Sequence, residues 1–208
     1  MTDLPVIRCP QRAFGDPTVA LDDPRWQSIA PVSLRSALRG EVPQQATRVR
    51  LAWTETDLRV LFEIEDTYVH ATLTARDALL YQEEVVEVFL DPVGDLLSYF
   101  EIEINPLNAI LDLVCRKNRS GYLRDFAWRC EDLRTAVQRT ETGWVAELAI
   151  PFASLTSERP AVGTRWRANF CRIDRPPEVE RELTAWSPPG RATFHTPERF
   201  GWVEFVEA

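Results

Sequence analysis

One short segment places several hydrogen-bonding side chains in a row. In residues 99–105, Tyr99, Glu101, Glu103 and Asn105 alternate with three apolar residues. Successive side chains of a β-strand point to opposite faces, so a strand here would put these four on one face. Two carboxylates and an amide beside an aromatic ring suit a sugar, whose hydroxyls hydrogen-bond while its C–H faces stack on rings. The alternative is the solvated outer face of an antiparallel sheet.

A further carboxylate stands in an apolar stripe. Glu87 lies between Val85 and Phe89 on the same face of a predicted strand. Burying an unpaired carboxylate is costly, so either an arginine pairs with Glu87 or its oxygens accept from a ligand in a groove. The neighbouring Glu83 and Glu84 are expected to be solvated.

Paired carboxylates also raise the alternative of a glycan-cleaving or glycan-modifying enzyme. Such enzymes need two acids about 5 to 10 Å apart. Two of Glu87, Glu101 and Glu103 could serve, although residues two apart on any strand meet that distance. The two histidines, His70 and His195, are expected to be structural, because no nucleophile motif or phosphate loop accompanies them. No cofactor is expected. Loop oxygens could hold a structural calcium, but no calcium-loop motif assigns one.

The charge and the termini limit the partners. Lysines and arginines number 24 against 32 aspartates and glutamates, giving a formal charge of -8, a balance that disfavours nucleic acid. No apolar run approaches the length that spans a bilayer, so a membrane is excluded as a partner.

The first ten residues carry no signal peptide, which predicts a cytoplasmic protein, or a secreted or periplasmic one if a leader was removed. Oligomeric state is left open. The four cysteines have no zinc-site spacing and are expected to be reduced.

Alternation of apolar and polar residues dominates the chain, which indicates strands. The expected strands are 47–53, 58–64, 84–91, 98–105, 109–116, 133–140, 144–150, 164–173 and 202–206. Short helices are expected at 74–81 and 151–155, and residues 1–30 are expected to run along the body before the first strand. Strands at regular spacing, with turns and no long helices between them, predict an all-β fold: an antiparallel β-sandwich or jelly roll, as a single domain over 1–208.

The order of the motifs resembles the family-nine carbohydrate-binding modules and their wider relatives, over about residues 20–206. The matching segments are 22–26, 47–53, 65–66, 76–77, 80–81, 84–92, 99–106, 144–147, 150–152, 163–173 and 195–201. The resemblance implies a β-sandwich that binds a sugar, in the xylanase-linked members the reducing end of a glucan or xylan chain, without catalysis of its own.

The resemblance also implies a set of ligand-binding residues. In those modules two tryptophan rings sandwich the terminal sugar; the first ring position corresponds to Tyr81 and the second falls near Arg172, with Trp186 as a substitute ring. The implied polar groups are Asp66, Glu87, Glu103, Asn105 and Asn169. If the cleft binds a sugar, Tyr81 and Arg172 should face each other across an open gap.

Three functions therefore stand side by side. The first is non-catalytic binding of a sugar or glycan chain end in a cleft on one face of the sandwich, in carbohydrate catabolism. The second is a structural or interaction module whose sugar site has decayed, with Arg172 in place of a ring. The third is the glycan-cleaving enzyme with paired glutamates.

Overall fold

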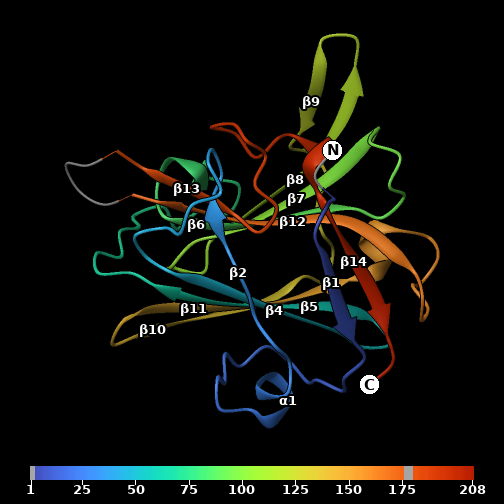
Figure 1. The fold of residues 1–208 in the computed structure, drawn as a ribbon, viewed down its shortest axis with the longest axis horizontal. Coiled ribbons are helices and arrows are strands. Elements are labelled where there is room, and N and C mark those ends of the chain that lie inside the picture. Colours follow the sequence, from blue (N-terminus) through green and yellow to red (C-terminus); the bar gives the residue numbers. More distant parts are fainter. Residues whose placement is uncertain (1–2, 176–179) are drawn as a thin grey trace.

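Two β-sheets packed face to face form the protein (Figure 1). The computed structural model describes residues 3–175 and 180–208. In the described residues the large sheet contains nine strands: β1 (Val6–Pro10), β14 (Gly201–Val206), β12 (Arg165–Asp174), β6 (Val85–Asp91), β7 (Ser98–Ile104), β8 (Ile110–Asn118) and β9 (Gly121–Asp125), in that order, with β13 (Glu182–Ala185) beside β12 and β3 (Arg35–Ser36) beside β13. The small sheet runs β10 (Arg134–Thr140), β11 (Gly143–Pro151), β5 (Asp57–Glu65), β4 (Thr47–Trp53) and β2 (Val32–Ser33). The predicted β-sandwich is confirmed.

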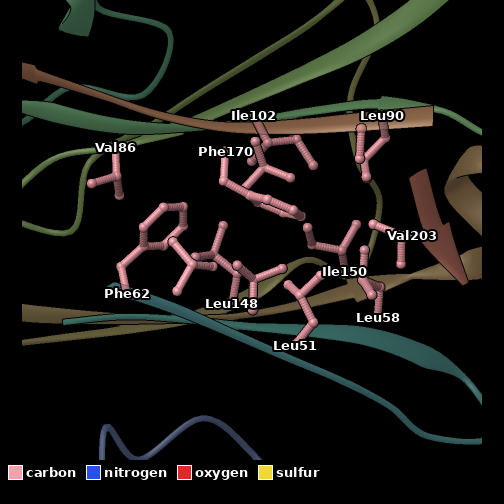
Figure 2. Close-up of a cluster of buried hydrophobic side chains, with 14 of the residues drawn as sticks. Leu51, Leu58, Phe62, Val86, Leu90, Ile102, Leu148, Ile150, Phe170 and Val203 are labelled. Carbon is pink, nitrogen blue, oxygen red and sulfur yellow. The ribbon is translucent and has the colours of Figure 1, made fainter. Parts of the chain in front are cut away.

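The main core lies between the sheets and follows the predicted alternation. Figure 2 shows Leu51, Phe62 and Leu148 of the small sheet meeting Ile102 and Phe170 of the large one. Each is buried, and removing such a side chain from water contributes about 1.5 to 3 kcal/mol. The other face of the large sheet is also buried, so this sheet separates two hydrophobic clusters.

Helical structure is shorter than the sequence predicts. The expected helix at 74–81 is wrong, because only the 3-10 turn η1 (Leu80–Gln82) forms there; η2 (Pro197–Arg199) precedes β14. The expected helix at 151–155 is present as α2 (Phe152–Leu155), and α1 (Pro24–Gln27) is capped by Asp23. No helix of the described chain is long and apolar enough to cross a membrane.

The N-terminal region was expected to precede the first strand, and this is wrong. β1 pairs with β14 in parallel, Val6 opposite Trp202 and Pro10 opposite Val206. β13 and β9 were also not predicted.

A buried ion pair fastens residues 13–19 to the outer side of the small sheet. Arg59 and Glu147 pair with 0% and 2% of their side chains exposed. Glu147 Oε2 also accepts from the backbone N–H groups of Thr18, at 3.0 Å, and Val19, at 2.9 Å. Arg59 donates to the carbonyl of Gly15. One carboxylate and one guanidinium therefore hold the backbone of this segment against the face of the sheet.

Glu147→Gln should lower the free energy of unfolding by about 3 to 5 kcal/mol, because it leaves the Arg59 charge buried without its partner. Urea denaturation followed by tryptophan fluorescence measures this. The paired change Arg59→Met with Glu147→Leu should recover most of the loss. Unchanged stability of Glu147→Gln would show that the pair does not hold the segment.

Candidate functional site

A pocket opens on the outer face of the large sheet, the face turned away from the small sheet. It has a volume of about 140 Å³, and Tyr81 of η1 lies in its wall, so we call it the Tyr81 pocket. Its lining is Tyr81, Glu87, Glu101, Arg124, Ile173, Arg181, Leu183, Ala192, Thr193, Phe194 and His195. A larger hollow of about 860 Å³, at the 54–57 turn, contains none of the predicted site residues.

Three carboxylates from neighbouring strands form the floor. Glu87 of β6 lies directly opposite Glu103 of β7, and Glu101 is two residues along from Glu103. The three are 2%, 0% and 3% exposed in that order, and each offers an oxygen within 4.8 Å of the others. In the described chain, Glu87 Oε1 and both oxygens of Glu103 have no hydrogen-bond donor. The floor could therefore accept hydrogen bonds from a ligand or hold a cation.

Burial controls protonation of this floor. Desolvation raises the pKa of Glu101 to about 7. The pKa values of Glu87 and Glu103 are raised well above their usual range, first by burial and then by the neighbouring carboxylates. A protonated carboxyl can donate as well as accept, so the floor offers both kinds of hydrogen bond near neutral pH.

His195 joins the floor to the rim. Its Nε2 lies 2.6 Å from Arg124 Nη2, and its Nδ1 lies 2.8 Å from the Tyr99 hydroxyl. Arginine can only donate, so Nε2 accepts and the ring proton is on Nδ1, facing Tyr99. Burial lowers the pKa of His195 to about 4, which keeps the ring neutral. The histidine thus positions Arg124 without adding charge.

Arg172 does not face Tyr81, and the predicted gap between them is wrong. Alternation along β12 sends Arg172 to the same side as Phe170, between the two sheets, whereas Cys171 and Ile173 point to the Tyr81 pocket side. The Arg172 Nη2 atom lies 3.1 Å from Asp66, 3.5 Å from Glu84 and 3.4 Å from Asp174, and Nη1 donates to the carbonyl of Glu65 at 2.9 Å.

The Arg172 cluster also overturns the expectation of a solvated Glu84. This side chain is fully buried, and desolvation raises its pKa to about 9. The oxygens of Asp66, Glu84 and Asp174 come within 4.8 Å of one another, a spacing that could hold a metal ion, but the guanidinium of Arg172 supplies the positive charge. The cluster ties the ends of three strands together.

Trp186 was expected as a substitute binding ring, and this is wrong. Only 7% of it is exposed, and it packs on Phe170 in the main core, with ring centroids 5.8 Å apart. A Cβ at Gly201 would lie 2.4 Å from the Trp186 ring, so the absence of a side chain at Gly201 makes room for it.

The two predicted amides hold backbone rather than line the pocket. Asn105 accepts from the N–H groups of Leu107 and Ala109 and donates to the carbonyl of Leu73. Asn169 exchanges two hydrogen bonds with the backbone of Ser187, at 2.9 and 3.0 Å. Of the eight predicted residues, only Tyr81 and Glu87 line the pocket, with Glu103 beneath them.

Sequence reasoning missed most of the rim. Arg124 lies on a strand that was not predicted, and Arg181 lies beside β13, also not predicted. His195 was noticed as part of a motif but expected to be structural. Phe194 contacts Phe89, with ring centroids 6.2 Å apart, and the residues between them in sequence number more than a hundred. No local pattern predicts that contact.

Comparisons with known proteins agree with this architecture. The family model described as "Carbohydrate family 9 binding domain-like" matches residues 18–208. An "Extracellular protein" of Arthroderma benhamiae is 26% identical, covering 92% of this chain and 91% of that protein. "Endo-1,4-beta-xylanase A" of Thermoanaerobacterium saccharolyticum is also 26% identical over 73% of this chain, but the match spans only 12% of that enzyme.

Solved structures share the fold at low sequence identity. A family 9 carbohydrate-binding module from Caldicellulosiruptor kristjanssonii, in complex with cellotriose, superposes with a TM-score of 0.76 at 18% identity, covering 98% of this chain and 95% of that one. A family 9 module from the same organism in complex with glucose gives 0.74 at 17% identity, covering 98% and 97%.

The acid floor predicts an unusual pH dependence. The folded state keeps protons on these carboxyls above their ordinary pKa of 4.5, where the unfolded chain has lost them. The free energy of unfolding should therefore fall as pH rises from 6.5 to 9, by up to about 1.4 kcal/mol per pH unit for each retained proton. His195 contributes an opposite slope only between about 4 and its ordinary 6.5.

Urea denaturation across this pH range measures the slope. Glu103→Gln should make the slope shallower, with Glu84 and the remaining floor carboxyls still contributing, whereas Glu158→Gln, at an exposed loop position, should leave the slope unchanged. A slope of zero or of the opposite sign in the unsubstituted protein would contradict a protonated floor.

Arg172→Met should destabilise the protein by about 3 to 5 kcal/mol, because it leaves three buried carboxyls without their cation. Arg172→Lys keeps the charge but not the planar guanidinium, so it should lose less stability than Arg172→Met. Thermal and urea denaturation of both variants test this, and equal stability of Arg172→Met and the parent protein would contradict it.

Proposed function

Because this chain belongs to the carbohydrate family 9 binding domain-like family, we propose that it is a non-catalytic carbohydrate-binding domain that takes a sugar or glycan chain end in the Tyr81 pocket. The observation that carries the proposal is the pocket itself. An aromatic side chain stands in its wall, and buried carboxyls that lack donors form its floor. A sugar ring supplies both an apolar face and hydroxyl donors.

The size of the pocket supports one sugar unit. A volume of about 140 Å³ is below the roughly 300 to 1,000 Å³ of pockets that take drug-sized ligands. A decayed site would be filled by its own loops, whereas this pocket is open beside Tyr81. The complexes of related modules with cellotriose and glucose support a glucose-containing ligand.

The geometry gives little support to the enzyme alternative. Glu87, Glu101 and Glu103 project from one sheet face, and oxygens of all three lie within 4.8 Å of each other. Glycosidases place two carboxyls on either side of the scissile bond, whereas these three lie side by side on one sheet face. The raised pKa of Glu101 follows from burial in a shared floor. We therefore assign these carboxyls to binding.

The wider setting is proposed on the relatives alone. The Arthroderma relative is named an extracellular protein, which favours an extracellular location over the cytoplasmic one expected above. The match to a xylanase covers a small part of that enzyme, and supports association with xylan degradation rather than hydrolysis by this chain.

Isothermal titration with glucose, cellobiose, xylobiose and uronic-acid sugars tests the proposal. We expect binding of at least one sugar, with an affinity between about 10 μM and 1 mM, because a small polar pocket buries little surface. Absence of binding by every sugar of the panel at millimolar concentration would overturn the proposal.

Tyr81→Ala should weaken the best ligand of this panel about tenfold, since it removes the ring that stacks on the sugar. Thermal stability should change little, because Tyr81 is only partly buried. The matched control is Tyr68→Ala, a half-exposed tyrosine that does not line the pocket and should not change affinity. Equal losses for both variants would place the sugar elsewhere.

A further inference from the structure

In the Tyr81 pocket the acidic side chains lie at the floor and the arginines lie at the rim. Glu87 and Glu101 lie at the floor with 2% and 3% of their surface exposed. Arg124 and Arg181 also line the pocket but are exposed, at its rim. A ligand therefore meets carboxyls with its buried part and guanidinium groups with the part that stays near solvent.

The rim guanidinium of Arg124 is held in place by a neutral hydrogen-bond partner rather than by a salt bridge. Its Nη2 donates to His195 Nε2 at 2.6 Å, and no carboxylate comes within 4.0 Å of its guanidinium nitrogens in residues 3–175 and 180–208. Because a guanidinium has five N–H donors in a planar fork, the other donors of Arg124 can face a ligand. The neutral His195 ring orients this fork and does not compete for an anion.

Positive charge continues from Arg124 along the β8–β9 hairpin, which projects beyond the body of the protein (Figure 1). The residues 116–125 carry four cationic side chains and one acidic one: Arg116, Lys117, Arg119, Arg124 and Asp125. Arg124 pairs with Cys115, and Lys117 is two residues along the same strand from Cys115. Alternation therefore puts Lys117 and Arg124 on the pocket side of the hairpin. Although the chain has a net charge of -8, this hairpin is locally positive and attracts anions.

We propose that the sugar preferred by the Tyr81 pocket carries a carboxylate: a uronic acid residue, with its hydroxyls toward Glu87 and Glu101 and its carboxylate on the fork of Arg124. The proposal rests on the sugar-binding function proposed above. A planar carboxylate can accept two parallel N–H donors from a guanidinium, a bond roughly twice as strong as a neutral one. A neutral sugar leaves Arg124 hydrated, and an amino sugar brings a like charge to it.

The acid floor does not repel such a ligand. Burial raises the pKa values of Glu87 and Glu103 well above their usual range and the pKa of Glu101 to about 7, so the floor retains protons near neutral pH. The ligand carboxylate stays at the rim, where solvent screens it from the floor. The floor of the pocket thus recognises the sugar hydroxyls, and its rim recognises the ligand carboxylate.

Isothermal titration of the whole chain with glucuronate, glucose and glucosamine at low salt tests the sign of the preferred charge. We expect glucuronate to bind about tenfold tighter than glucose, with glucosamine weakest, and the gap to narrow as ionic strength rises above about 0.1 M. Glucose binding as tightly as glucuronate, or tighter, would overturn this inference and leave the sugar-binding proposal standing. Absence of binding by every sugar would overturn both.

A charge-removing variant locates the preference. Arg124→Gln should bring the ratio of glucuronate to glucose affinity close to one. Arg159→Gln, an exposed arginine outside the Tyr81 pocket, should leave the ratio unchanged. A ratio that survives Arg124→Gln would contradict the assigned role of this side chain, and circular dichroism of each variant confirms that it folds.

Discussion

Burial of both faces of the large sheet is the constraint on which the rest of the structure depends. Alternation along each strand sends one side chain to the main core and the next to a second apolar layer under the loops. A polar residue in the middle of the central strands β6, β7 and β12 therefore has no solvated side to occupy. Glu87, Glu103 and Arg172 are all buried for this reason, and each must find a proton, a partner or a ligand.

The two polar clusters meet that demand in different ways. Between the sheets, Arg172 brings a permanent charge to Asp66, Glu84 and Asp174. None of these four residues lines the Tyr81 pocket. On the outer face, the floor carboxyls have no such cation in contact and open instead onto a cavity. We expect the first cluster to contribute to stability, and the second forms the floor of the proposed sugar site.

Local sequence patterns predicted the features that depend on neighbours in the chain. The alternation at 99–105 gave the correct face for Glu101 and Glu103, and the expected strands 47–53 and 58–64 match the paired strands β4 and β5. The patterns failed where partners come from distant elements. Glu84 looks solvated from its neighbours, because its arginine lies almost ninety residues later, and the rim residue Arg124 becomes relevant only when β9 folds beside β8.

The parallel pairing of β1 with β14 has a kinetic consequence. Val6 and Trp202 stand opposite each other, so this pair closes a loop of nearly the whole chain. Contacts of such large sequence separation form slowly, because the chain loses loop-closure entropy before the contacts contribute any stability. During synthesis, β1 must wait unpaired until the last strand has left the ribosome. The edge of the large sheet is thus the part expected to form last.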